Sequence, residues 1–356
     1  MIAALGLALG LAAAPLRAEP LRIATFHVDL PRAGPGLLLR DILRGDPQVE
    51  AVARIVAENA PDALLLTDFD YDHGLAALRA FRDVVGQAGH AMPHLFALRP
   101  NTGMATGLDM DGDGRTGTPR DNQGFGRFAG EGGMAILSRL PVEAAEVRDF
   151  SDLLWRDLPG ALLPETAEGA PFLAPRVLEV QRLSTTGHWV VPLRMPDGST
   201  MHLLAFDATP PVFDGPEDLN GRRNHDELRF WQLFLDGAFG PPPSGRFVIL
   251  GNANLDPEDG EGRRAAIRAL LADPRLQDPR PASAGGAAVA DPAHRGNPAL
   301  DTVDWDGPEP GNLRVDYVLP SADWRVTGAG VVWPGDGTAE AASRHRLVWV
   351  DLLPPD

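Results

Sequence analysis

Gly251-Asn252-Ala253-Asn254 directly follows Arg246-Phe-Val-Ile-Leu250, an apolar run typical of a buried strand. Two other segments place polar residues beside apolar runs in the same way: Arg314-Val-Asp316-Tyr317-Val-Leu319, and Ser343-Arg344-His345 just before Leu347-Val-Trp-Val350. Amide, carboxylate and imidazole groups can position a nucleophile, move a proton and stabilise charge on a phosphate ester. The three segments therefore predict one active site built from the ends of neighbouring strands.

Strand-like and helix-like stretches alternate along the rest of the chain. Asp46-Pro47 is typical of a helix start, and apolar residues then recur at helical spacing. Because no linker or repeat interrupts the alternation, residues 20–356 are predicted to form a single domain, with Pro- and Gly-rich surface loops at 158–175, 240–245 and 279–311. Strands are expected at 21–26, 63–66, 133–138, 188–193, 202–206, 247–250, 315–319 and 347–350, and helices at 47–56, 75–85, 218–235 and 262–271.

In order and spacing, the strand-end segments resemble those of the endonuclease/exonuclease/phosphatase superfamily, and the resemblance extends over about residues 20–353. It implies an α/β (α+β) fold in four layers, in which two packed mixed β-sheets are flanked by helices. It also implies a metal-dependent phosphoesterase of the phosphodiesterase, nuclease or phosphatase type. The cofactor would be Mg²⁺ or Mn²⁺, and the partner would be a phosphate-ester substrate.

Five residues match the family pattern or replace it conservatively. The resemblance implies that Asp29 and Asp68 bind the metal, since carboxylate oxygens suit hard cations. Asp68 stands where the family has a Glu, so its side chain is one methylene shorter. The resemblance also implies that Asn254 positions the phosphate or nucleophile, that His345 is the acid/base group and that Asp316 orients it. Without the family pattern, each of these residues could equally be an ordinary strand-end residue.

Four positions depart from the family pattern. His27 stands where Asn is usual, and Asp207 stands where a phosphate-contacting His is common; both are assigned to substrate binding. Asn252 replaces the Asp that activates or orients water, and an amide cannot take a proton. Arg344 replaces a metal-binding Asp and could hold a phosphate through two hydrogen bonds. Two functions therefore remain open: a phosphoesterase, or a catalytically degraded relative that binds a ligand or partner.

Arg222 and Arg223 are two further candidates for phosphate binding. They lie near the start of the helix expected at 218–235, where free backbone N–H groups favour an anion. A capped helix with solvated charges fits the same residues equally well.

Asp109-Met-Asp111-Gly-Asp113-Gly114 matches the front half of a calcium-binding loop. The closing Glu is absent, because Arg120 occupies its position, although Asp121 follows immediately and could replace it. The segment predicts either a Ca²⁺ site or an acidic loop rich in turns.

The chain of 356 residues has a formal net charge of −17, which weighs against tight binding of long nucleic acid. It contains no cysteine, so no disulfide is expected. Residues 1–18 resemble a secretory signal peptide, although a misassigned start or a buried strand would also explain the apolar run. That run is too short to span a membrane, which takes about 20 residues. A secreted or periplasmic monomer is expected.

Overall fold

The computed structural model describes residues 19–305 and 310–354, and its architecture is two stacked mixed sheets. The expected signal peptide lies outside the described residues. The first sheet has the order β12 (Arg325–Val331), β13 (Val348–Leu353), β1 (Leu21–His27), β2 (Ala63–Phe69), β4 (Gly133–Ser138) and β3 (His94–Phe96). The second has the order β11 (Asp316–Pro320), β8 (Phe247–Asn252), β7 (Thr200–Asp207), β6 (Gly187–Arg194) and β5 (Arg148–Asp149). A two-stranded ribbon pairs β9 (Val303–Asp304) with β10 (Asn312–Leu313).

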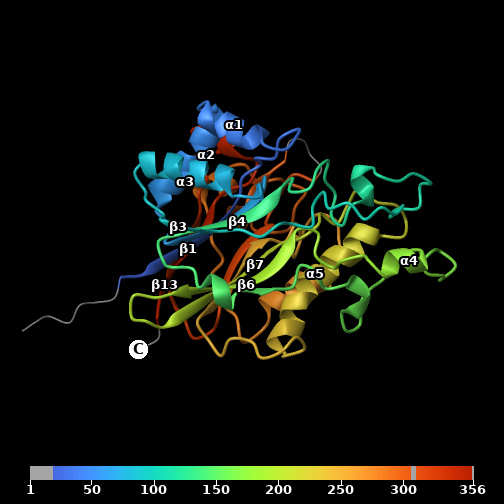
Figure 1. Cartoon of the computed structure of the whole chain (residues 1–356). Coiled ribbons are helices and arrows are strands. Elements are labelled where there is room, and N and C mark those ends of the chain that lie inside the picture. The colour runs from blue at the N-terminus through green and yellow to red at the C-terminus, as the bar shows by residue number, and fades with distance from the viewer. Residues whose placement is uncertain (1–18, 306–309, 355–356) are drawn as a thin grey trace, which may run out of the picture.

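Helices cover the outer faces of both sheets, so the predicted four-layer arrangement is confirmed (Figure 1). On the first sheet lie α1 (Leu37–Leu43), α2 (Pro47–Asn59), α3 (Ala76–Gln87) and α8 (Thr338–Ala342). On the second lie α5 (Leu219–Leu235), α6 (Ala265–Leu271) and the short α4 (Pro175–Leu178), while α7 (Ala284–Ala288) lies in the long segment before β9. Among the helices of the described residues, none combines the length and apolarity that crossing a bilayer requires.

The core between the sheets is made by the inward faces of central strands. Ile23 and Leu65 of the first sheet belong to one fully buried cluster with Trp189, Leu203 and Val248 of the second. Burial of each such side chain stabilises the fold by about 1.5–3 kcal/mol. None of the predicted site residues belongs to this cluster, so the core that joins the sheets is separate from the chemistry at their edge.

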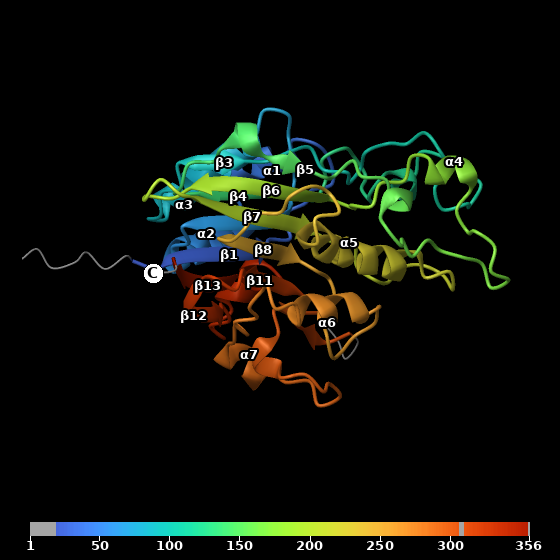
Figure 2. The same cartoon turned by 90° about the horizontal axis from the view of Figure 1, so that it is seen from below.

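Strand directions bring the predicted site residues to one edge of the sandwich. β1 and β2 run parallel, as do β7 and β8, so each pair ends at the same side. In the antiparallel pair β8–β11, Asp316 lies opposite Asn252, and Asn252 in turn lies opposite Asp207. Figure 2 shows β1 and β8 close together at the centre of the molecule, where the two sheets face each other. The ends of five strands therefore meet there.

Candidate active site

A cleft of about 790 Å³ opens at this edge. Four of the residues predicted at strand ends line it: His27 at the end of β1, Asp68 in β2, Asp207 at the end of β7, and Asn254 two residues after β8. Asn254 is held in place because its side-chain amide donates to the backbone oxygen of Ala208 at 2.8 Å. The convergence of these strand ends agrees with the prediction from the sequence.

His345 and Asp316 form a buried pair beside the cleft. The imidazole Nδ1 of His345 donates to Oδ2 of Asp316 at 2.8 Å, and the hydroxyl of Thr302 donates to the same oxygen at 3.0 Å. Because Nδ1 carries the proton, Nε2 of His345 keeps its lone pair. Burial lowers the pKa of His345, and the positive charge of His27 adds to this effect, although Asp316 opposes it. The ring is therefore neutral near pH 7 and able to accept a proton.

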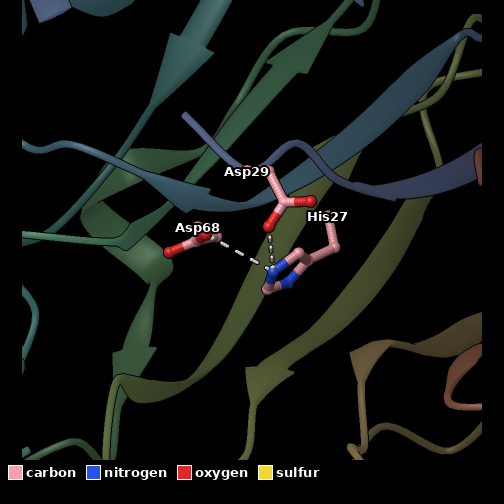
Figure 3. A group of neighbouring side chains, drawn as sticks. All are labelled: His27, Asp29 and Asp68. Carbon is pink, nitrogen blue, oxygen red and sulfur yellow. Dashed lines mark ion pairs between the residues drawn. The ribbon is translucent and has the colours of Figure 1, made fainter. Parts of the chain in front are cut away.

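His27 contacts this pair and also lines the cleft. Its ring packs on that of His345 with centroids 4.0 Å apart, and Trp305 meets His345 edge-on at 5.8 Å. Nε2 of His27 points between two carboxylates, 3.4 Å from Asp68 and 3.7 Å from Asp29 (Figure 3). Burial alone would lower its pKa, but Asp68, Asp29 and Asp207 together raise the pKa of His27 to about 10. A cationic ring therefore stands at the centre of the acidic groups.

Asn252 is fully buried and acts on the cleft only through its neighbours. Its Oδ1 accepts the backbone N–H of Asn254 at 2.9 Å, which fixes the orientation of the amide. Nδ2 is consequently the atom that lies 3.2 Å from Nδ1 of His27. An amide donates to Nδ1 only when that nitrogen carries no proton. The contact with Asn252 therefore favours the neutral form of His27, whereas the neighbouring carboxylates favour the protonated form.

Asp29 is bound tightly by Arg344. The guanidinium contacts both carboxylate oxygens, at 2.7 and 3.2 Å, and the backbone N–H of Arg344 donates to Oδ2 at 3.0 Å. The hydroxyl of Ser343 donates to the same oxygen at 3.0 Å. Burial would raise the pKa of Asp29, but Arg344 and the nearby histidines lower it overall. The carboxylate is thus kept ionised, with part of its charge offset by the arginine.

Asp207 is one of the acids on the cleft wall and is more than nine-tenths buried. The hydroxyl of Thr186 donates to its Oδ2 at 3.1 Å. Burial raises the pKa of Asp207 to about 7, against the opposing charge of His27. Near neutral pH this carboxyl group can therefore donate a proton. The histidine that is common at this position in the family could do the same.

Arg222 and Arg223 do not gather into a phosphate site. Arg222 donates to the backbone oxygen of Leu163 at 3.1 Å. Arg223 reaches the cleft wall but is buried, and its Nε donates to Leu183 O at 2.8 Å while Nη2 donates to Gln123 O at 2.6 Å. These contacts hold loops together, so they do not support the predicted contact with phosphate.

The predicted calcium loop brings three of its four acids together. Asp109, Asp111 and Asp121 each offer an oxygen within 4.8 Å of the others, but Asp113 does not join them. Asp121 is buried and already accepts from Met110 N at 2.9 Å and from both the backbone and hydroxyl of Thr118 at 2.8 Å. Its carboxylate therefore serves at least partly to fold the loop.

Trypsin offers a direct test of Ca²⁺ binding, because Arg115 and Arg120 are exposed cleavage sites within this loop. We expect slower cleavage there in Ca²⁺ than in chelator, since the carboxylates repel one another without a cation. In an Asp111→Asn variant the difference should shrink. Equal digestion of wild type in both conditions would leave only an acidic turn.

Comparison with known proteins places this arrangement in a family. The model of the Endonuclease/Exonuclease/phosphatase family matches residues 33–345. The chain belongs to this family. A search of curated protein sequences found no match.

Solved structures share the fold of this family at low sequence identity. An endonuclease/exonuclease/phosphatase from Beutenbergia cavernae DSM 12333 is 16% identical with a TM-score of 0.55, over 95% of this chain and 72% of that one. A mannosyl-6-phosphatase from Bacteroides thetaiotaomicron VPI-5482 is 13% identical with a TM-score of 0.50, over 94% and 99%. A family member from Bacteroides vulgatus is 11% identical with a TM-score of 0.52, over 95% and 100%.

Members of the endonuclease/exonuclease/phosphatase family typically use divalent metals, and this site has the donors for one. Asp29, Asp68 and His27 each offer a ligand atom within 4.8 Å of the others. The two carboxylates suit a hard divalent cation, whereas the imidazole coordinates only through an unprotonated nitrogen. The donor set therefore fits a metal held chiefly by Asp29 and Asp68.

Several residues that support the site are not marked by any sequence pattern. Thr302 accepts the backbone N–H groups of Val315 and Asp316 at 3.0 Å and donates to the Asp316 carboxylate. Trp305 lies just beyond β9 in the same segment and contacts His345. These residues meet β11 and His345 only in the folded structure, so no local sequence pattern could have identified either of them.

Proposed function

We propose that the protein is a metal-dependent phosphoesterase that hydrolyses phosphate esters. The observation that carries the proposal is the His345–Asp316 pair at 2.8 Å, packed against His27, which points at the Asp29 and Asp68 carboxylates. It combines a proton acceptor with a place for a cation, the two requirements of metal-assisted ester hydrolysis. The family supports the reaction class, since its members act on phosphoester bonds.

Each group has a chemical role in this proposal. Mg²⁺ or Mn²⁺ held by Asp29 and Asp68 would stabilise negative charge on the phosphoryl oxygens. His345 accepts a proton from the attacking water, and Asp316 stabilises the imidazolium that forms. Asn254, fixed through Ala208, presents its amide edge to the phosphate. Asp207 supplies a proton to the departing alcohol.

Hydrolysis of mono- and bis-p-nitrophenyl phosphate with Mg²⁺, Mn²⁺ and Ca²⁺ in turn tests the proposal. We expect release of p-nitrophenol with Mg²⁺ or Mn²⁺ and loss of activity with chelator. A folded protein that is inert towards both esters with every metal would overturn it. We also propose export to the periplasm or the medium, on the basis of the signal-like residues 1–18; cell fractionation tests this.

A second function, ligand binding without catalysis, is favoured by one specific contact. Arg344 contacts both oxygens of Asp29. Its guanidinium therefore already supplies part of the positive charge that a metal ion would bring to this carboxylate. Tight binding of phosphate esters with no turnover in any metal would support this alternative.

The pH dependence tests the role of Asp207. Because its pKa is raised to about 7, the proton-donating form is present below that pH and is lost as pH rises through it. We expect kcat/KM for an alkyl phosphate ester, a poor leaving group, to fall as pH rises above about 7. Asp207→Asn should slow this ester by about 10²–10⁴-fold. A p-nitrophenyl ester, whose leaving group needs no proton, should be affected far less. Equal slowing of both esters would exclude Asp207 as the proton donor.

A further inference from the structure

Several apolar side chains line the cleft together with its acidic groups. Beyond the acidic groups, its lining includes Met110, Phe125, Phe172 and Phe213. Two of these side chains are unusually open to solvent, since Phe125 is 65% exposed and Phe213 is 73% exposed. Large apolar side chains exposed at the mouth of a polar cleft are typical of ligand contact.

Phe213 is also held in an unfavourable backbone conformation. Its φ of 70° lies in the left-handed region, which a bulky side chain rarely adopts. The backbone is fixed on both sides: Asn220 Nδ2 donates to Val212 O at 2.6 Å, and Arg120 donates to Phe213 O at 3.3 Å. Strain of this kind persists where a side chain is needed at a particular place. Glycine would fit the turn better, so packing does not explain the phenylalanine.

The charge of the cleft limits which phosphate esters it can accept. The cationic groups of its lining are His27, Arg120 and Arg223, and the last of these is occupied by backbone oxygens. Acids outnumber them, which disfavours a ligand with several phosphates. The acidic side chains of the lining are Asp68, Asp111, Glu131, Asp207, Asp214 and Glu217.

We infer that Phe125 and Phe213 form an apolar rim that selects esters of a single phosphate with a neutral, apolar alcohol. This inference rests on the proposed function of the same site and names its substrate class. The phosphoryl group lies at the strand-end residues, and the alcohol lies against the two rings. The alcohol carries either a ring or an alkyl chain. Both present an uncharged apolar surface to the two phenylalanine rings.

Binding of phosphonates, which are not hydrolysed, tests the inference separately from catalysis. Calorimetry with phenylphosphonate, octylphosphonate and methylphosphonate should show wild type binding an apolar ligand about 5- to 10-fold tighter than methylphosphonate. The better of the phenyl and octyl ligands identifies a ring or a chain. In Phe125→Ala/Phe213→Ala this preference should vanish while methylphosphonate affinity stays within about twofold. Leu43→Ala, which removes a side chain that is 72% exposed on α1, is the matched control.

A stability measurement separates ligand recognition from a structural role. Phe213→Gly relieves the left-handed strain, so its Tm should equal or exceed that of wild type while the apolar preference falls. A lower Tm with the preference intact would assign Phe213 to the fold and overturn the inference. Equal affinity of wild type for all three phosphonates, or tighter binding of a thymidine tetranucleotide than of phenylphosphonate, would also overturn it. Absence of hydrolysis would remove only the proposed function.

Discussion

Replacing His345 by Gln is expected to lower kcat/KM for a phosphate diester by about 10²–10⁴-fold, the usual contribution of a general base. Glutamine can fill most of the space of the ring, but it cannot accept a proton from water near neutral pH. The measurement is steady-state hydrolysis of bis-p-nitrophenyl phosphate at saturating metal. Because His345 is buried, the circular dichroism spectrum of the variant has to match that of wild type before the loss is assigned to chemistry.

The chain contains a matched control for this substitution. His225 and Asp226 form another His–Asp pair at 3.0 Å on α5, and neither residue lines the cleft. His225→Gln should leave kcat/KM within about twofold. If His345→Gln keeps most of its activity, or if both variants lose activity equally, His345 is not the base.

Asp316→Asn should have a smaller effect than His345→Gln, and the reason is geometric. Thr302 donates to the same Asp316 oxygen that accepts from His345, so an asparagine would place its carbonyl oxygen there and keep the imidazole tautomer. Only the negative charge would be lost. The prediction is that kcat falls and that the acidic limb of the pH profile moves to lower pH, because Asp316 raises the pKa of His345 against the effect of burial.

Introducing carboxylates at positions 252 and 344 is expected to raise kcat/KM by about tenfold for each change and about 100-fold for both together. In Asn252→Asp, the new carboxylate oxygen would accept a hydrogen bond from the protonated Nδ1 of His27. The present amide cannot do so, because it offers its own N–H to that nitrogen. In Arg344→Asp, the cation bound to Asp29 is removed and a hard ligand is added. For Arg344→Asp, metal affinity, measured by titration with Mn²⁺, should rise in parallel.

Arg344→Gln separates the two effects of the second change. It removes the positive charge without adding a carboxylate, so it should raise Mn²⁺ affinity less than Arg344→Asp does. If wild type is already an efficient phosphodiesterase and both carboxylate variants slow it, Arg344 and Asn252 are adaptations to the natural substrate. If every variant is folded and inert, the binding function stands.

Much of the fold follows from local sequence signals. β4 (Gly133–Ser138) coincides with the strand expected there, and α2 begins at Pro47 with the Asp46 carboxylate capping two backbone N–H groups. α1 was missed because its cap is Gly36, with no side-chain hydrogen bond to mark the start. β12 was missed because glycines interrupt its apolar pattern. A Cβ at Gly330 would lie 2.8 Å from the ring of Trp349, which explains the absence of a side chain there.

The site was predictable only in part, because strand ends are local and their contacts are not. The sequence pointed to Asp29, Asp68 and Asn254 at strand ends; the structure brings Asp29 close to Asp68 and places Asp68 and Asn254 on the same cleft. The ring contact between His27 and His345 joins residues more than 300 positions apart. The orientation of the Asn252 amide depends on a single backbone N–H. Such contacts have no sequence pattern and require coordinates.

The separation between the central core and the strand ends has an evolutionary consequence. Residues such as Trp189 and Val248 join the sheets through their inward faces, whereas the reactive side chains extend from positions where the strands stop. A mutation at a strand end therefore leaves the apolar contacts between the two sheets in place. This architecture can thus carry different catalytic groups on one retained core. His27, Asn252 and Arg344 depart from the family pattern at such positions, outside the cluster that joins the sheets.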